Sequence, residues 1–515
     1  MLAIYLATIP FLYFFLDYLL GIKKDEQEPP FVASKVPWAG HILRIFTSNR
    51  RNYFLSLSGK NPHPIFSLAA PRSRIYVVTK LEIVSDILKK SKTIAVGPFF
   101  ISFVQRLFGF NDRAATILSQ EREGGKQDLF EELTKMLHAG LANGKELDEA
   151  HAQATKYMQS ALDRLVSMKG CTTVTLMEWL RYETTIATCN AIWGPENPIN
   201  NTEIVDDFYT LKSATPALLI NIFPALTARS GHRARLRLAH VFARYYATDG
   251  QAKAMQIVRD RYDVCVSHNL TIEDIGFIEI STLYAAIVNL TTAAFWTVVH
   301  IFEDDDLLAA VRKELAADEE SEGSAGEGEG QAGPLLRSIM KEVIRVYGSG
   351  SMTRYVKADT AVSDPTAISS SDKTRDYVVK QGGLVQMPVE VFHTDIGVWG
   401  FDAEEFDPYR FYHHSHGLRK ENGVKSKVSP TAFRGWGAGS TMCPGRFLAL
   451  RSIGSLVTML VREFQIEKAR EGMKEGNMGN HGVRGWGVQK GKAYDFVDAM
   501  RGPENDVDVE ISRRA

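Results

Sequence analysis

The sequence predicts a mainly α-helical fold with a small β-sheet part, placed behind an N-terminal membrane anchor. From Lys126 to roughly His300, almost every window of the sequence has the apolar spacing of a helix. Short stretches rich in β-branched and aromatic residues, between residues 64 and 80 and again after residue 355, predict strands. The first 22 residues are the most hydrophobic segment of the chain and predict the anchor.

The composition indicates a globular protein with a large core, because 45% of the 515 residues are hydrophobic and 23% are charged. The net charge of −1 creates no global field that attracts nucleic acid, so we expect no nucleic-acid partner. The four cysteines are scattered without paired spacing, which argues against disulfides and for a reducing compartment. They are Cys171, Cys189, Cys265 and Cys443.

Residues 1–22 have a length close to the roughly 20 residues that span a bilayer. Lys23 and Lys24 follow directly, and the positive-inside rule therefore places the rest of the chain in the cytosol. The segment has no small-x-small cleavage site, so a retained single-pass anchor is favoured over a removed signal peptide. A core or interfacial helix stays open as the alternative, because Asp17 interrupts the segment.

Prolines stiffen residues 23–40, which we interpret as a hinge before one domain over residues 41–515. In that domain, the strands between residues 64 and 80 precede a helix over Leu81–Lys90, and Pro98–Phe103 begins an aromatic loop. Residues 216–226 form an apolar island beside a run of arginines, a pattern typical of a surface that contacts anionic lipid. A plain amphipathic helix is the open alternative for that island.

The longest predicted helix starts near Thr271, which can cap its first turn, and runs to about Phe302. It is apolar on nearly all faces, so we expect it to be buried. Ala285, Asn289, Ala293 and Trp296 share one face of this helix. Small alanines there leave room for a ligand, and the lone amide of Asn289 needs a hydrogen-bond partner. The other interpretation of Asn289 is a core residue that caps a helical carbonyl.

Residues 318–333 are acidic and glycine-rich without periodicity, and predict a surface insertion between helices. A helix over Leu335–Val346 follows and places Glu342 and Arg345 on one face, where they can pair. Strand-like stretches come next, at residues 355–361, 376–379 and 384–388.

A glycine-rich stretch, residues 433–445, contains Cys443 just before an apolar run with helical spacing. A thiol at a helix N-terminus has a lowered pKa and is easily held as thiolate, which is a nucleophile, a zinc ligand or an axial iron ligand. Zinc is disfavoured because no second Cys or His lies two to five residues away. A thiolate on haem iron fits better. The alternative is a glycine-rich turn with a buried, inert cysteine.

The pattern of Trp436, Gly437, Gly439, Cys443 and Gly445 resembles the haem-binding signature of the cytochrome P-450 family, which usually begins with Phe. Glu342-x-x-Arg345, then Phe406–Phe411 and then Cys443 occur in the order that the family has. The resemblance covers essentially residues 30–515. It implies a cytochrome P-450 fold that holds haem b, with the glycine-rich residues around the cofactor and the Cys443 thiolate as axial ligand of the iron.

Other site residues follow from the same resemblance. It implies a buried structural network of Glu342, Arg345 and Arg410 beneath the haem. Arg354 matches an arginine that binds a haem propionate. Thr441 stands where many members have an Arg or His for that purpose, and a Trp-x-x-x-Arg pattern is missing. Arg354 is therefore expected to contribute more to propionate binding than the matching arginine does in members that have those residues.

At the centre of the long helix, the family usually has an acid–threonine pair. Alignment on Ala285-Ala286 puts Val288 at the acid and Asn289 at the threonine. An asparagine there resembles the branch that contains sterol 7α- and 12α-hydroxylases and prostacyclin synthase. Asn289 is then the candidate catalytic residue. An amide cannot ionise, so it would act by ordering water.

The resemblance implies a haem-thiolate monooxygenase in the endoplasmic reticulum membrane, with its catalytic domain in the cytosol. An NADPH-dependent P-450 reductase would supply electrons. The substrate would be a lipophilic small molecule, such as a steroid, a terpenoid or another polycyclic secondary metabolite. One alternative keeps the fold but isomerises or dehydrates a peroxide-type substrate without reductase. The other alternative is a catalytically silent haem or lipid binder.

Overall fold

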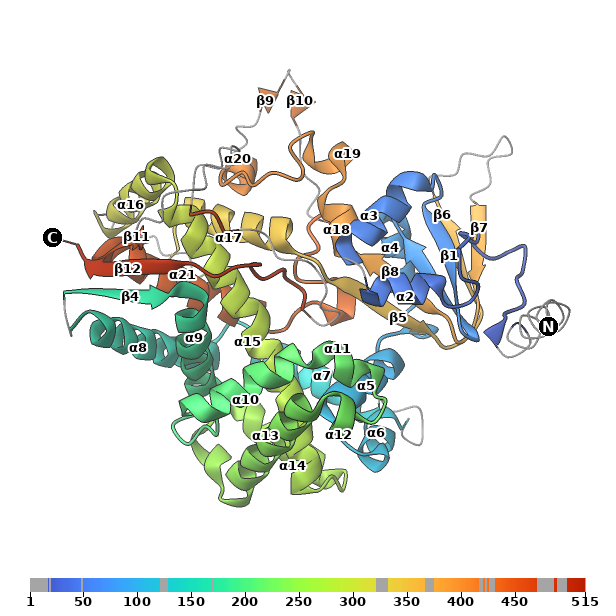
Figure 1. The fold of residues 1–515 in the computed structure, drawn as a ribbon, viewed down its shortest axis with the longest axis horizontal. Helices are drawn as coiled ribbons and strands as arrows, with labels where there is room; N and C mark the ends of the chain where they lie inside the picture. The colour runs from blue at the N-terminus through green and yellow to red at the C-terminus, as the bar shows by residue number, and fades with distance from the viewer. Residues whose placement is uncertain are drawn as a thin grey trace, which may run out of the picture.

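The computed structural model describes residues 17, 20–47, 50–120, 128–167, 170–320, 332–365, 375–415, 420–421, 424–425, 431–469, 486–488 and 498–514. Most of the predicted anchor at residues 1–22 and of the predicted insertion at residues 318–333 lies outside the described residues, although the chain is still helical at residues 318–320. Helices make up most of the molecule, and the largest sheet lies at one end of it (Figure 1). The prediction of a mainly helical fold with a small β-sheet part is therefore confirmed.

The first half of the chain contributes helices that lie beside the large sheet and helices that form much of the helical part (Figure 1). They are α2 (Gly40–Thr47), α3 (Arg50–Lys60), α4 (Leu81–Lys89), α5 (Gly97–Phe108), α6 (Asp112–Ser119), α7 (Leu129–Gly140), α8 (Lys145–Ser167), α9 (Leu176–Trp193), α10 (Thr202–Ser213), α11 (Thr215–Ile220), α12 (Pro224–Thr227), α13 (Arg229–Ala247), the 3₁₀ helix η1 (Gly250–Lys253) and α14 (Gln256–Ser267). The later helices are α15 (Ile272–Phe302), α16 (Asp305–Glu320), α17 (Pro334–Tyr347), α18 (Val389–His393), α19 (Ile396–Trp399), α20 (Arg410–Ser415), the 3₁₀ helix η2 (Gly439–Thr441) and α21 (Arg446–Glu463).

Helix α15 crosses the middle of the molecule (Figure 1), where it packs against α9, α13, α17 and α21. The Thr271 side chain accepts from the Asp274 backbone N–H, and the Asp274 side chain accepts from the Thr271 N–H. This capping box satisfies donors that a helix start leaves free. In the described part of the chain, α15 is the one helix long and apolar enough to span a membrane, but 78% of that window is buried in the protein. The predicted long buried helix is thus confirmed as the core helix.

Four sheets are present among the described residues. The five-stranded sheet has the order β1 (Ile65–Ala70), β2 (Ser73–Val78), β8 (Leu384–Pro388), β5 (Ser351–Val356) and β3 (Ile94–Ala95). The smaller ones join β11 (Phe464–Lys468), β12 (Asp508–Arg513) and β4 (Cys171–Thr175), then β6 (Thr360–Asp364) with β7 (Arg375–Val379), and β9 (Lys420–Glu421) with β10 (Val424–Lys425). In the large sheet, β5 pairs antiparallel with β8, so that Arg354 lies opposite Val385. The sheet thereby fixes the register of a candidate site residue.

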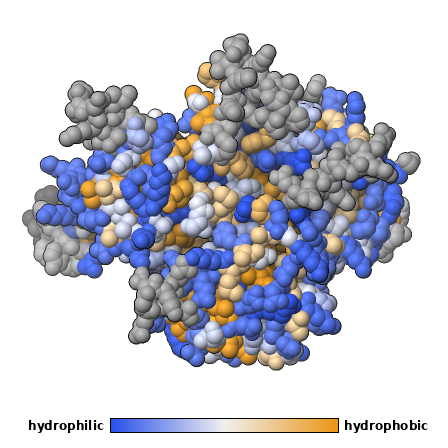
Figure 2. Space-filling view, turned by 180° about the vertical axis from the view of Figure 1, so that it is seen from behind, coloured by the Kyte–Doolittle hydropathy of each residue, from blue (hydrophilic) through white to orange (hydrophobic). Residues whose placement is uncertain are grey.

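Two local predictions are wrong. The predicted aromatic loop at Pro98–Phe103 belongs to helix α5, because proline is tolerated in a first turn and Gly109, at φ 85°, ends the helix. The predicted strand over residues 355–361 is split, since β5 ends at Val356 and β6 begins at Thr360. The surface seen from behind is mainly hydrophilic, with apolar groups scattered over it (Figure 2).

Candidate active site

The Cys443 loop, residues 433–445, folds back on itself before α21 begins at Arg446. The Cys443 N–H donates to the Trp436 carbonyl at 2.8 Å, and the Met442 N–H donates to the Gly439 carbonyl at 3.1 Å. Gly437 and Gly439 have φ values of 76° and 64°, a region that residues with a side chain rarely adopt. The two glycines therefore permit the turn that carries the thiol. Gly445 is the N-cap residue of α21.

The same loop is fixed against helix α17. A Cβ atom added at Gly435 would lie 2.3 Å from Ile344 Cγ2 and 2.7 Å from the Phe433 ring, so this position excludes larger residues. The Arg434 N–H donates to His393 Nε2 at 2.9 Å, while His393 Nδ1 lies 3.0 Å from the Arg345 carbonyl. The loop thus takes its position from the Glu342-x-x-Arg345 helix.

The pKa of Cys443 differs from the sequence-based expectation. Burial raises the pKa of the thiol above its usual value, although hydrogen bonds from the Gly445 and Arg446 backbone and the charge of Arg446 lower it. The expected lowering of the pKa by a helix start is therefore outweighed by desolvation. A metal ion bound to the sulfur deprotonates such a thiol outright. Among the described residues, no group of three His, Cys, Asp or Glu side chains could hold a metal ion, so a multi-ligand site has no candidate there.

Helix α15 is accessible along one stripe, and we call the space over this stripe the hollow. Ala285 is exposed and Ser281, Ala286 and Asn289 are half-buried, although most of the helix is buried in the core. Positions 281, 285 and 289 are four residues apart and therefore lie on one helix face. The first turn of α21 is half-buried as well, including Phe447 and Leu450. We interpret this hollow as the space for the cofactor and substrate.

Arg354 carries a buried positive charge without a carboxylate partner among the described residues. Its guanidinium donates to the carbonyl of Thr353 and to the hydroxyl of Thr441, and burial lowers its pKa to about 10. A buried guanidinium held only by neutral oxygens is suited to an anionic group such as a haem propionate. The residues present therefore fit a haem whose carboxylates lie near Arg354.

Glu342, Arg345 and Arg410 lie together in the core and are essentially inaccessible to solvent. Glu342 Oε1 lies 2.6 Å from Arg345 Nη2 and 2.9 Å from Arg410 Nε. Arg345 also donates to the carbonyls of His393 and Glu405, at 2.7 and 2.9 Å. Arg410 donates to the Asp402 carboxylate, at 2.9 Å. Each buried charge is thus compensated, and the network ties α17 to the segment that leads to the Cys443 loop.

Asn289 has a tertiary partner. Its side-chain oxygen accepts a hydrogen bond from the Ala499 backbone N–H at 3.0 Å, so it contacts a turn near the end of the chain rather than a carbonyl of its own helix. Trp296, on the same helix, donates to the Arg501 carbonyl at 2.8 Å. The turn at residues 498–501 is therefore held against α15 at two points.

Sequence reasoning did not identify two contacts of the Cys443 loop. From the sequence, Thr441 was noted only because an arginine or histidine is missing at its position. In the structure, its hydroxyl accepts a hydrogen bond from Arg354. His138 on α7 lies with Nε2 3.2 Å from the Ser440 carbonyl, at the edge of the loop. The spacing of Thr441 from Cys443 was a signal that could have suggested its role. Nothing in the local pattern marks His138.

This combination of fold and site defines the class of haem-thiolate oxidoreductases. Residues 29–485 match the model of the cytochrome P-450 family, and the chain belongs to that family. It is similar to cytochrome P-450 monooxygenase nodJ of Hypoxylon pulicicidum, with 27% identity over 86% of this chain and 84% of the relative. It is also similar to 25-hydroxycholesterol 7-alpha-hydroxylase of Rattus norvegicus, with 25% identity over 65% of this chain and 83% of the relative.

Among solved structures, retinoic acid bound cyanobacterial CYP120A1 has the same fold, with a TM-score of 0.65, 17% identity and coverage of 95% of this chain and 99% of that one. The chain is a cytochrome P-450 monooxygenase, and haem with thiolate-ligated iron is its cofactor. When bound, the haem supplies the iron at which dioxygen is activated. The contribution of the protein is to hold the cofactor and to shape the space around it.

Proposed function

We propose that this protein is a membrane-anchored monooxygenase that oxidises a lipophilic substrate, with Cys443 as the axial ligand of the haem iron. The observation that carries the ligand assignment is the Cys443 loop. Its two positive-φ glycines turn the backbone, and Cys443, which is half-buried, lies just before α21, a helix that packs against α15. The other cysteines do not compete in this position. Cys189 and Cys265 are buried in the helical core, and Cys171 is exposed on β4.

The remaining residues have supporting roles in the proposal. Arg354, held by Thr441, binds a haem propionate. Trp436, Gly437, Gly439 and Gly445 shape the loop around the cofactor. The network of Glu342, Arg345 and Arg410 keeps α17 and the loop in register and takes no part in the chemistry. Asn289 orders water at the edge of the hollow, since its amide can donate and accept hydrogen bonds but cannot ionise.

The membrane part of the proposal rests on two features. Residues 1–22 would be the anchor and residues 23–40 the hinge, which leaves residues 41–515 as the catalytic domain in the cytosol at the endoplasmic reticulum. Four apolar side chains around α11 and α12 are exposed by 53–79%, and they precede exposed arginines at the start of α13. They are Ile220, Ile222, Phe223 and Leu226, followed by Arg229 and Arg233. An apolar surface beside arginines suits contact with an anionic bilayer.

The proposed substrate is a steroid, a terpenoid or another polycyclic secondary metabolite. The name of one relative gives a hydroxylated sterol as its substrate, and that relative is one-quarter identical to this chain. A fungal monooxygenase is similar over most of the chain. NADPH-dependent P-450 reductase is the proposed electron donor. The comparisons favour monooxygenation over the isomerase reading, because the relatives named above are a monooxygenase and a hydroxylase.

The ligand assignment is tested with the full-length holoenzyme. We expect the reduced protein with carbon monoxide to show the red-shifted Soret band of a thiolate-ligated haem. The Cys443→Ala variant is expected to lose this band, while Cys189→Ala, which removes a buried thiol elsewhere, keeps it. Retention of the band in Cys443→Ala would exclude Cys443 as the ligand. Product formation that needs both NADPH and dioxygen, with reductase present, separates the monooxygenase from the isomerase.

A further inference from the structure

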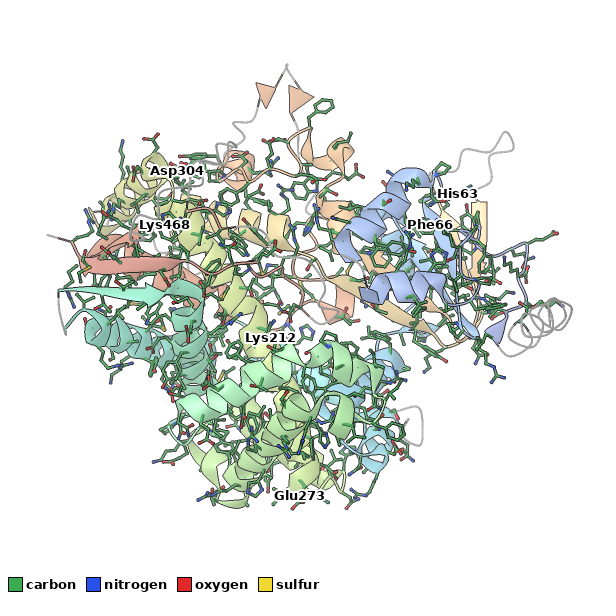
Figure 3. The ribbon with its side chains drawn as sticks, viewed as in Figure 1. His63, Phe66, Lys212, Glu273, Asp304 and Lys468 are labelled. Carbon is green, nitrogen blue, oxygen red and sulfur yellow. The ribbon has the colours of Figure 1, made fainter. Side chains whose placement is uncertain are left out.

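A cluster of charged and polar side chains forms around Asp498. Lys212 Nζ is 2.7 Å from Asp498 Oδ2, and the Tyr284 hydroxyl donates to Asp498 Oδ1 at 2.9 Å. The three residues come from the end of α10, from α15 and from the turn at residues 498–501. Figure 3 shows Lys212 near the middle of the molecule, and the ring of Phe208 on α10 packs against the ring of Tyr284 on α15. Three distant parts of the chain therefore meet at one carboxylate.

Two neighbours of the cluster belong to, or contact, the accessible stripe of α15. Tyr284 immediately precedes Ala285, which is exposed on the stripe of α15. Ala499, the neighbour of Asp498, donates to Asn289 on the same stripe. The side chain of Lys212 is 19% exposed and that of Asp498 is 8% exposed, so the ammonium-bearing side chain is the more accessible of the two. We infer from these neighbours that the cluster borders the space that a substrate would enter.

Aromatic rings pack against Tyr284 in this cluster. The rings of Phe108 and Phe208 lie 5.7 and 6.0 Å from the ring of Tyr284, measured between centroids. A buried ion pair contributes little net stability, and well-packed apolar residues often replace one without loss. A polar group in an apolar pocket does contribute specificity, because a ligand that lacks the matching oxygen leaves it desolvated and unpaired. Stability alone therefore gives no reason for charges in this cluster.

We propose that Lys212, Asp498 and Tyr284 form a subsite for a neutral oxygen function of the substrate, a hydroxyl above all. A hydroxyl can accept a hydrogen bond from the Lys212 ammonium and donate one to the Asp498 carboxylate. A substrate carboxylate is repelled by Asp498, and a plain hydrocarbon desolvates the pair without a new hydrogen bond. The subsite fixes one end of the substrate and so limits which carbons reach the haem. The inference rests on the proposed function, because it needs the hollow to be the substrate site.

The competing explanation is a purely structural role, in which the pair only ties α10 to the turn at residues 498–501. A structural contact affects stability and the binding of all ligands alike, whereas a subsite changes the order of affinities within a matched series of ligands. We therefore use two skeletons, each as hydrocarbon, alcohol and acid. They are 5α-androstane, 5α-androstan-3β-ol and 5α-androstane-3β-carboxylic acid, and dehydroabietane, dehydroabietinol and dehydroabietic acid.

The measurement is the dissociation constant of each compound, from its Soret spin-state shift in the full-length ferric holoenzyme. For at least one skeleton, we expect the alcohol to bind about tenfold more tightly than the hydrocarbon and the acid, the size of one charge-assisted hydrogen bond. If neither alcohol binds more tightly than its hydrocarbon, the inference is wrong. The carbon monoxide spectrum of the same preparation separates this failure from that of the proposed function, because it reports the thiolate ligand independently of any substrate.

Variants identify the side chains responsible. Lys212→Met should remove the advantage of the alcohol, and Lys212→Arg should keep most of it. Asp498→Asn should instead raise the affinity for the acid about tenfold, because Lys212 remains and the opposing charge is gone. Asp498→Asn also provides a test if Lys212→Met fails to fold. Lys145→Met removes the same charge from an exposed surface pair and serves as the control. An unchanged order of affinities in Lys212→Met and Asp498→Asn would show that the cluster has only a structural role.

Discussion

At the scale of single residues, the side chains of the site act through partners from other elements. Asn289 accepts from the backbone of Ala499, and Arg354 donates to Thr441. In both cases the residue near the hollow is held by a polar contact that fixes its direction. Removal of either side chain therefore has two effects, the loss of its own chemistry and the release of its partner.

Asn289 is expected to couple the use of NADPH to product formation. In the proposed role its amide orders water, so Asn289→Leu should release hydrogen peroxide and lower the product formed per NADPH about tenfold or more. Asn289→Thr, which retains a hydroxyl, should keep much of the coupling. Thr292→Val is the control, because that hydroxyl donates to the Val288 carbonyl inside the helix. Unchanged coupling in Asn289→Leu would make Asn289 a packing residue.

The pair of Arg354 and Thr441 is expected to control how tightly the haem is held. Arg354→Leu removes a charge-assisted hydrogen bond and should accelerate haem transfer to apomyoglobin roughly tenfold. Thr441→Val removes only the group that holds Arg354 and should have a smaller effect, while Thr441→Ser should behave as the wild type. Equal rates of haem transfer in all four proteins would show that neither residue contacts the cofactor.

At the scale of elements, the buried network connects α17, the segment around α19 and α20, and the Cys443 loop. Arg345 reaches the carbonyls of His393 and Glu405, and His393 in turn accepts from the backbone of Arg434. Burial, together with the charge of Arg345, lowers the pKa of His393 to about 3, so the ring is neutral and one nitrogen remains an acceptor. The loop that carries Cys443 is thus positioned by hydrogen bonds that protonation near neutral pH does not disturb.

Glu342→Gln should destabilise the protein, because two buried guanidiniums then lose their common carboxylate. The expected loss is about 3–5 kcal/mol, seen as a fall of the thermal midpoint in circular dichroism and as a lower haem content. Glu178→Gln is a matched control, since Glu178-x-x-Arg181 has the same sequence pattern but Glu178 is exposed. A fall of similar size in Glu178→Gln would show that the effect does not come from burial of the network.

At the scale of the whole molecule, an exposed apolar surface supports the proposed contact with a membrane. The exposed side chains around α11 and α12 include Phe223 and Leu226, at 75% and 79%. Exposed apolar side chains in such a group mark an interaction site more often than a free surface. The helix in the described part of the chain that could span a bilayer, α15, is instead the core of the domain. The anchor at residues 1–22 stays a prediction.

Anchor and orientation are tested together in sealed microsomes. We expect the full chain to remain with the membranes after a salt wash and a chain without residues 1–22 to be partly released, because the surface around α11 and α12 still binds lipid. Phe223→Ser with Leu226→Ser should complete the release of the shortened chain. Protease added outside should digest the catalytic domain. Protection of the domain would overturn the orientation, and release of the full chain without detergent would overturn the anchor.

The sequence by itself determined what depends on local pattern. The run after Cys443 predicted α21, the cap at Thr271 predicted the start of α15, and the order of the three motifs identified the family. These are properties of neighbouring residues, and helical periodicity is visible within a few turns. The same reasoning failed at Pro98–Phe103, which was predicted as an aromatic loop although Pro98 lies in the first turn of α5.

Only the tertiary structure decided which distant residues meet. Arg354 and Thr441 are 87 positions apart, and Tyr284 and Asp498 are 214 apart, so no periodicity relates them. It also decided the direction of the Cys443 pKa shift, because the desolvation of a thiol depends on everything packed around it. Local pattern specifies the elements and the reactive residue types. The electrostatics and the shape of a site come from side chains that the fold brings together across the chain.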